Sequence, residues 1–152
     1  MRVTGVIGTA DLAALREAVR LGRISAHFAP DEFRCKCGGR YPDCRRVRVP
    51  RATVVAAEKL RTLIGGFTPI STYRCPGRNA HVGGYERSQH LYGLAMDIPP
   101  TLTPRQLRPL GVFSGFGVQS STGKVRHVDL RHLSPDNFPR ATLAEPRIYT
   151  YG

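Results

Sequence analysis

The 152-residue sequence has no uninterrupted apolar run long enough to cross a bilayer. Its first fifteen residues also lack the apolar centre of a signal peptide, because polar residues and glycines interrupt it: Thr4, Gly5, Gly8, Thr9 and Asp11. No internal repeat, low-complexity run or linker divides the chain. We therefore expect a single domain over 1–152, made in a cytoplasm without a signal peptide and with no membrane partner.

Acidic residues are scarce. Eleven Asp and Glu stand against 23 Lys and Arg, which gives a formal charge of +12 that attracts polyanions in general. The arginines are spread from Arg2 to Arg147 without a dense basic run or a recognised nucleic-acid-binding motif, so nucleic acid is not the expected partner. The charge fits attraction to acidic wall polymers, and it fits a merely solvated cationic surface equally well.

Cysteine is limited to four residues, three of them within CKCGGRYPDC: Cys35, Cys37, Cys44 and Cys75. In a reducing compartment such a cluster more often binds metal or stays as thiols than forms disulfides. The Cys-x-Cys spacing is, however, tighter than the two-residue spacer of zinc ribbons. A structural zinc site and a disulfide pair both remain open, and neither would specify an activity.

Twelve prolines and sixteen glycines predict short elements. Apolar residues at helical spacing indicate helices over 9–22 and 50–66, the second with Val54, Ala57, Leu60 and Ile64 on one face. A third helix is expected over 103–107, where Thr103 and Gln106 have the spacing of a capping box. The first of these lies in a helical extension over 1–24.

Alternating patterns predict strands over 67–73, 93–98 and 124–132, whereas 133–152 is expected to be an irregular tail. In the last strand, period-two alternation places Val125, His127, Asp129 and Arg131 on one face. The fold class is therefore α+β, with a small sheet and flanking short helices.

The segment SQHLYGLAMDI places histidine and aspartate in an otherwise apolar run. Alternation along 93–98 puts Asp97 on the face opposite Leu94, Met96 and Ile98, where its charge needs a compensating partner. His90, Asp97 and His127 together offer two imidazoles and one carboxylate, a ligand set that suits catalytic zinc and leaves a position for water. Hydrolysis of an amide is the natural use of such an ion.

The same residues carry a family resemblance. SQHLYGLAMD followed by RHVDLR, with STYRCPGRN, VGG and HFAPDEFRCKCGG upstream, resembles the zinc D-Ala-D-Ala carboxypeptidases of peptidase family M15. Relatives of that family include D,D-dipeptidases, phage endolysins and the amino-terminal domain of hedgehog proteins. The resemblance runs from about Ser25 to Arg131 and implies an α+β fold around a small antiparallel sheet.

The resemblance also implies roles for single residues. It assigns the zinc ligands to His90, Asp97 and His127. It places Arg74, from STYR, near the metal, where a guanidinium can stabilise an oxyanion or hold a substrate carbonyl. We expect Ser88 and Gln89 to support the His90 loop and to border the substrate.

A general base is harder to assign. The sequence lacks His-Glu-x-x-His, and Lys124 stands three residues before His127, where many relatives have a carboxylate. Asp129 follows His127 on the same strand face and is predicted to be the acid/base group. The alternative is that Asp129 orients the imidazole or pairs with Arg131, and Glu86 is a third choice for the base.

These observations predict a zinc metallopeptidase that cleaves stem peptides of bacterial peptidoglycan as a D,D-carboxypeptidase or an endopeptidase. The lack of a signal peptide suits a phage lytic or virion protein that acts at the cell wall or in a virion, with phage tail proteins as partners. The alternative, which Lys124 favours, is a non-catalytic zinc-bearing phage structural, adaptor or binding module.

Overall fold

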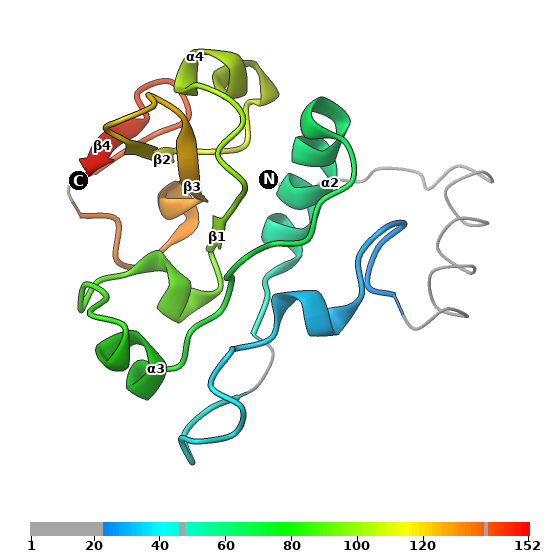
Figure 1. Ribbon diagram of the computed structural model, residues 1–152, viewed down its shortest axis with the longest axis vertical. Helices are drawn as coiled ribbons and strands as arrows, with labels where there is room; N and C mark the ends of the chain where they lie inside the picture. The colour runs from blue at the N-terminus through cyan, green and yellow to red at the C-terminus, as the bar shows by residue number, and fades with distance from the viewer. Residues whose placement is uncertain (1–22, 46–47, 139) are drawn as a thin grey trace.

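The computed structural model describes residues 23–45, 48–138 and 140–152 (Figure 1). The helix predicted over 9–22, and with it most of the extension over 1–24, lies outside these residues. Within the described ranges, no helix has both the length and the apolar character needed to cross a membrane.

A four-stranded sheet forms the centre of the fold, in the order β1 (Ala95–Asp97), β3 (Val125–Asp129), β2 (Gly115–Gln119) and β4 (Arg147–Tyr151). Strand β3 is antiparallel to β1 and β2, whereas β4 pairs parallel to β2. The α+β class is therefore confirmed, with a mixed sheet in place of the expected antiparallel one. The irregular tail predicted over 133–152 is wrong for β4, an edge strand whose half-exposed residues give no apolar alternation.

The predicted helices form where hydrophobic spacing and capping agree. Helix α2 (Arg51–Ile64) buries Val54, Ala57 and Leu60, and it ends at Gly65, whose φ of 78° favours glycine. Helix α4 (Pro104–Leu107) begins after Thr103, whose backbone N–H donates to Gln106 Oε1 at 2.9 Å. Strand β2 was not predicted, and neither were five short helical elements: α3 (Pro76–His81) and the 3₁₀ turns η1 (Pro30–Phe33), η2 (Gln89–Tyr92), η3 (Arg108–Leu110) and η4 (Arg131–Leu133).

The strand predicted over 67–73 is wrong. This segment reaches the sheet only through an isolated bridge, in which Asp97 N–H donates to Ser71 O at 2.8 Å and Ile70 N–H donates to Asp97 O at 2.9 Å. Since β1 is only three residues long and Pro69 has no N–H to donate, a longer ladder does not form.

The apolar core covers one face of the sheet. Met96, Phe116 and Val128 from three strands pack there with α2 and with the aromatic residues around η1. As predicted, Leu94, Met96 and Ile98 are buried in this core, while Asp97 lies on the opposite face with His127. Asp97 and His127 thus stand on the face of the sheet that lies away from the apolar core.

Strand β3 departs from the predicted alternation at one residue. His127 pairs with Gly117 and Val125 pairs with Val118, so Arg126 is an extra residue in a β-bulge. The bulge turns Val125 into the apolar core, and its predicted position on the His127 face is wrong.

Two glycines of β2 leave room on the opposite face. A Cβ at Gly115 would overlap the Asp129 carboxylate, and one at Gly117 would lie 2.9 Å from His127 Cβ and overlap the Tyr151 ring. Because glycine has no side chain, the polar groups of β3 and β4 can stand directly over β2.

Candidate metal centre

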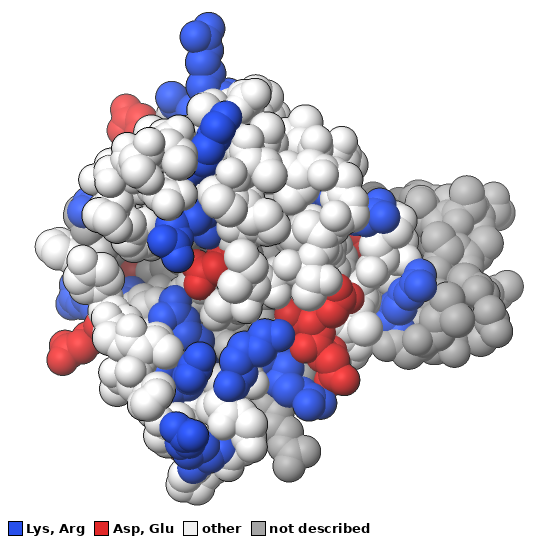
Figure 2. Space-filling model, viewed as in Figure 1, with Lys and Arg blue, Asp and Glu red and all other residues white. Residues whose placement is uncertain are grey.

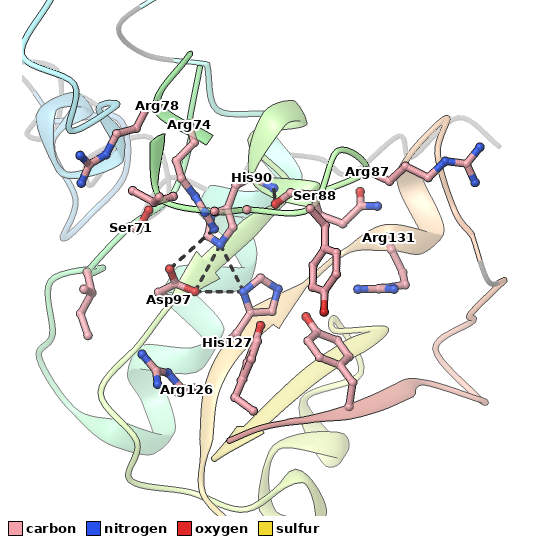
Figure 3. A pocket seen from close by; sticks show the side chains of 18 of the residues that line it. Ser71, Arg74, Arg78, Arg87, Ser88, His90, Asp97, Arg126, His127 and Arg131 are labelled. Carbon is pink, nitrogen blue, oxygen red and sulfur yellow. Dashed lines mark hydrogen bonds and ion pairs between the residues drawn. The ribbon is translucent and has the colours of Figure 1, made fainter. Parts of the chain in front are cut away.

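Three short elements bring His90, Asp97 and His127 together. His90 lies in η2, which Ser88 caps by accepting the His90 backbone N–H at 3.4 Å and which Gly93 ends with a φ of 67°. Asp97 of β1 and His127 of β3 are direct cross-strand partners, so their side chains are neighbours on one face. The sequence predicts this group, and the structure assembles it (Figure 3).

Hydrogen bonds fix which ring nitrogens face the centre. His90 Nδ1 lies 2.5 Å from Thr72 O, a carbonyl that can only accept, so Nδ1 carries the hydrogen and Nε2 turns its lone pair inward. His127 Nε2 lies 3.3 Å from the Asp129 carboxylate, which in the same way leaves Nδ1 facing inward. Both imidazoles therefore point acceptor nitrogens at the same place.

The converging atoms are spaced for a small cation. His90 Nε2 lies 3.2 Å from His127 Nδ1 and 3.2 Å from Asp97 Oδ1, and His127 Nδ1 lies 3.0 Å from Asp97 Oδ1. Tetrahedral ligands about 2.0–2.1 Å from zinc lie about 3.3 Å from one another. Two imidazole lone pairs and a carboxylate at these separations repel unless a positive charge lies between them, so the donor set fits zinc.

Burial and hydrogen bonding set the charges of the three groups. Burial lowers the pKa of His90, which favours its neutral form. Burial would raise the pKa of Asp97, but its contacts with the imidazoles of His127 and His90 hold it well below its usual value. Burial likewise opposes a charge on His127, yet its hydrogen bonds with Asp129 and Asp97 raise its pKa. These shifts favour an ionised Asp97 beside a neutral His90, which is the charge state that a metal ligand needs.

Asp129 stands behind the site. Its side chain has no exposed surface, and its carboxylate accepts from Arg131 Nε at 2.9 Å and Arg131 Nη2 at 2.5 Å as well as from His127. Burial would raise the pKa of Asp129, but hydrogen bonds with Arg131 and His127 lower it strongly. A carboxylate with both oxygens occupied on the far side of His127 is badly placed to take a proton from water in the pocket. These contacts favour the alternative role, in which Asp129 orients His127 and pairs with Arg131, and the acid/base role of Asp129 stays a prediction.

Arg74 reaches the same pocket. Its Nη2 lies 4.0 Å from Asp97 Oδ2, its side chain is 15% exposed, and its Nε is buried without a hydrogen-bond partner. Burial lowers the pKa of Arg74, although a guanidinium stays charged at any physiological pH. A partly unsatisfied cation beside the metal centre is available to a negatively charged ligand.

The pocket around the centre is strongly basic. Among the residues that the structure describes, Asp97 is the only acidic lining residue, whereas seven lining residues are basic: Lys36, Arg74, Arg78, Arg87, Arg126, Arg131 and Arg147. Glu86 is exposed and Lys124 half-buried, and neither lines the pocket. Their places outside the lining argue against a general base at either position.

Ser88 and Gln89 both line the pocket, as expected for residues that border a substrate. Gln89 also donates from Nε2 to Asp136 O at 2.9 Å, which attaches the segment after β3 to the His90 loop. Its Oε1 is buried without a partner. Whether either side chain contacts a substrate stays a prediction.

Sequence reasoning missed Tyr149 and Tyr151, which line the pocket from β4. The Tyr149 ring lies 5.8 Å from the His127 ring between centroids, and its hydroxyl donates to Asp129 Oδ2 at 3.4 Å. Burial raises the pKa of both phenols, so they remain protonated donors. The two tyrosines of RIYTY were the available signal, but they carried no information about pairing with β2.

Comparison with known proteins agrees with this geometry. A search of curated proteins returned no match. The family model described as Peptidase M15 matches residues 26–133, a range that includes Arg74, the three converging side chains and the Asp129–Arg131 pair. Because that match covers most of the 152 residues, the chain belongs to the peptidase M15 family of metallopeptidases.

Proposed function

We propose that this M15 metallopeptidase uses zinc to hydrolyse peptide bonds in bacterial peptidoglycan. The observation that carries the proposal is the convergence of His90, Asp97 and His127 ligand atoms at 3.0–3.2 Å in a pocket lined by arginines. Membership of the family implies a peptide substrate. The peptidoglycan assignment is the finer step, and it rests on the charge of the pocket.

The residues of the centre have separate proposed roles. His90, Asp97 and His127 would hold the zinc ion, and Asp129 with Arg131 keeps the His127 ring in its binding orientation. When bound, zinc lowers the pKa of water and polarises a carbonyl. Since Asp97 is the most exposed of the three ligands, with 33% of its side-chain surface accessible, the open side of the centre lies next to it.

Arg74 provides the second positive charge. Its guanidinium lies beside Asp97, so charge that develops on a carbonyl oxygen near the metal would meet a fixed cation. The unpartnered Nε means that Arg74 loses no internal hydrogen bond at that atom when it binds a substrate. We assign Arg74 to oxyanion stabilisation or to holding the substrate carbonyl.

The basic lining suits a substrate with free carboxylates. Figure 2 shows Lys and Arg side chains spread over the visible face, while Asp and Glu form one larger patch and a few isolated spots. Arginine binds carboxylates with paired hydrogen bonds, and the stem peptides of peptidoglycan carry several carboxylates on a short chain. We therefore propose the bacterial cell wall as the place of action, with acidic wall polymers as secondary partners. The phage origin and the tail-protein partners stay predictions.

The test is hydrolysis of purified peptidoglycan by zinc-loaded protein, measured as release of new amines or of free D-alanine. We expect turnover that is lost on chelation, restored by zinc and absent in Asp97→Asn. The matched control Glu86→Gln changes an exposed carboxylate outside the pocket and should retain the wild-type rate. No release of amines or D-alanine by a protein that carries zinc at this site would contradict the proposal.

That negative result would favour a second function, a binding module that keeps the metal centre without catalysis. The absence of a second carboxylate from the described lining of the pocket is the observation that favours it. Peptidoglycan fragments would then bind to the zinc-loaded protein and be recovered uncleaved.

A further inference from the structure

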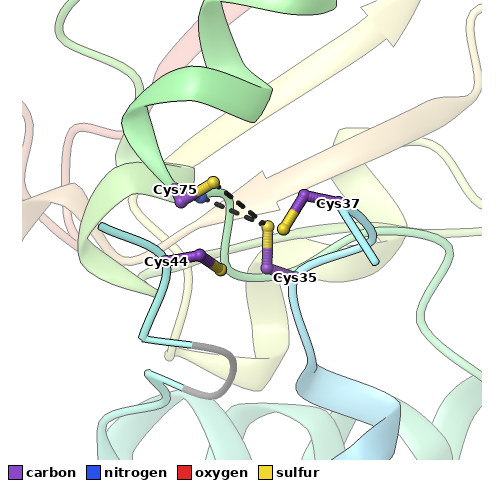
Figure 4. Close-up of side chains that lie close together, drawn as sticks. All are labelled: Cys35, Cys37, Cys44 and Cys75. Atoms are coloured by element: carbon purple, nitrogen blue, oxygen red, sulfur yellow. Dashed lines mark hydrogen bonds between the residues drawn. The ribbon is translucent and has the colours of Figure 1, made fainter. Parts of the chain in front are cut away.

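The four cysteines form a second cluster, away from the pocket. Cys35 and Cys37 follow η1, Cys44 lies at the end of the same loop, and Cys75 precedes α3. Their sulfur atoms all lie within 4.8 Å of one another, and Figure 4 shows the four side chains pointing toward a common centre. Cys35 and Cys75, whose sulfurs lie 3.7 Å apart, are forty residues apart in the sequence.

The sequence leaves a structural zinc site and a disulfide pair open as alternatives. The spacing of the sulfurs distinguishes them. Cys35 Sγ lies 3.7 Å from Cys75 Sγ, well beyond the bond length of about 2.0 Å in a disulfide. Four sulfurs each about 2.3 Å from a tetrahedral zinc ion lie about 3.8 Å from one another. A pair of disulfides would not require all four sulfurs to gather at one point, whereas a single ion does.

We propose that Cys35, Cys37, Cys44 and Cys75 hold one structural zinc ion, distinct from the ion of the peptidase centre. A closed set of four thiolates leaves no position for water or substrate, so this ion supports the fold and does not react.

The surroundings suit a negatively charged zinc–thiolate group. Cys35 and Cys75 are buried beside Tyr73, and Cys75 N–H donates to Cys35 Sγ at 3.4 Å. Four thiolates around Zn²⁺ carry a net charge of −2. The segment that supplies three of them contains four basic residues and one acid over 34–45, namely Arg34, Lys36, Arg40, Arg45 and Asp43.

The proposed ion would fasten an otherwise irregular loop. Residues 35–44 contain neither helix nor strand, and Gly38 and Gly39 both have positive φ, so little regular structure holds this loop in place. The Tyr41 ring lies against Gly77 of α3, where a Cβ would overlap it. When a site is formed by such a loop, metal binding supplies much of the free energy that orders it.

The cluster also adjoins the peptidase centre through the backbone. Cys75 directly follows Arg74, whose backbone N–H donates to His90 O at 3.0 Å. We therefore infer that the ion at the cysteines helps to position Arg74, a consequence that rests on the proposed function, whereas the metal site itself does not.

The experiment measures metal content and the absorption of the cobalt-substituted chain. Wild-type protein should bind two ions, and Co²⁺ should give a thiolate-to-metal charge-transfer band. Cys37→Ser and Cys44→Ser should lose the band and one ion. Asp97→Asn, the matched control, should also lose one ion but keep the band. Wild-type protein that binds a single ion without sulfur ligation, or Cys37→Ser that still holds two ions, would overturn the proposal.

A second measurement applies if the cysteine variants fail to fold. Alkylation of the folded wild-type chain should modify its four thiols at least about tenfold faster after chelation than before, because ligated thiolates are protected. Equal rates with and without chelator would contradict metal ligation, and a mass showing two disulfides in the unreduced protein would establish the competing arrangement. Neither readout depends on peptidase activity, so failure here is distinguishable from failure of the proposed function.

Discussion

The two clusters of metal-binding side chains are built in opposite ways. His90, Asp97 and His127 stand on paired strands and a capped turn, and the ring orientations are set by Thr72 O and Asp129. The cysteines are carried mainly by an irregular loop with a small apolar cluster of its own. The first site is preorganised before an ion arrives, whereas the second depends on its ion for its shape. Removing metal should therefore abolish activity at the first site and unfold the loop that carries the cysteines.

The largest expected effect is at the preorganised site. Asp97→Asn should lower kcat/KM on peptidoglycan peptides by about 10³-fold or more, because it removes the only anionic metal ligand while keeping the shape of the side chain. Thermal unfolding should change little, since Asp97 lies at the open edge of the site. A collapse of Tm in this variant would mean that the site is a structural one, like the proposed cysteine site.

The buried Asp129–Arg131 pair behind His127 should contribute to the free energy of unfolding. Arg131→Met leaves the buried Asp129 carboxylate without its main partner, which should cost about 3–5 kcal/mol of the free energy of unfolding. Urea denaturation measures this loss. The comparison variant Arg34→Met breaks an exposed pair with Asp31 and should cost less than about 1 kcal/mol. Similar losses in the two variants would show that burial of the Asp129–Arg131 pair is unimportant.

Arg74→Lys should reduce kcat by about 10–100-fold with unchanged metal content, because lysine keeps the charge but loses the planar fork of donors. The same change at Arg126, an exposed residue of the pocket lining, should reduce kcat by less than about threefold. Steady-state kinetics with metal analysis separates the two, and equal losses would argue for a general charge effect in place of a specific role for Arg74.

Chelation tests directly whether the two sites differ in how far their structure depends on metal. After removal of metal, trypsin should cut first within 35–45, at Lys36, Arg40 or Arg45, while the sheet and α2 stay protected. Mass spectrometry of the early fragments identifies the cut. Initial cleavage around β1 or β3 would reverse the assignment of which site depends on its ion.

The smallest effect concerns pH. Burial opposes a charge on His127, but hydrogen bonds with Asp129 and Asp97 raise its pKa above the usual 6.5, so a proton competes with metal there as the pH falls. The pKa of His90 is lowered by burial, and this ring needs no deprotonation near neutrality. Zinc affinity at this centre should thus fall by about tenfold per pH unit below the His127 pKa, and calorimetry measures the slope. At the cysteines, where several thiols must lose protons, the slope should be steeper.

Much of the fold and the site follows from local sequence. Helix α2 was predictable because apolar spacing and a terminal glycine agree, and the His90–Asp97–His127 group because its spacing is distinctive. Strand β4 was missed because its pairing with β2 depends on contacts far apart in sequence. The place of Val125 was missed because a bulge shifts the alternation of β3 by one residue.

Asp129 shows a further limit of prediction from sequence. Its side of the strand was predicted correctly, but alternation alone does not show how deeply a residue is buried, and the buried pair with Arg131 favours an orienting role. Arg131, two positions further along the chain at the start of η4, was a visible partner in the sequence. Only the structure shows that this partner occupies both carboxylate oxygens.

Strand β4 has a practical consequence for anyone who produces this protein. Tyr149, Tyr151 and Gly152 all line the pocket, so an affinity tag or fusion partner appended after Gly152 would emerge at the mouth of the peptidase centre. Such an extension could occupy the arginine-lined space and compete with substrate. A purification handle after Gly152 should therefore be cleaved off before any assay.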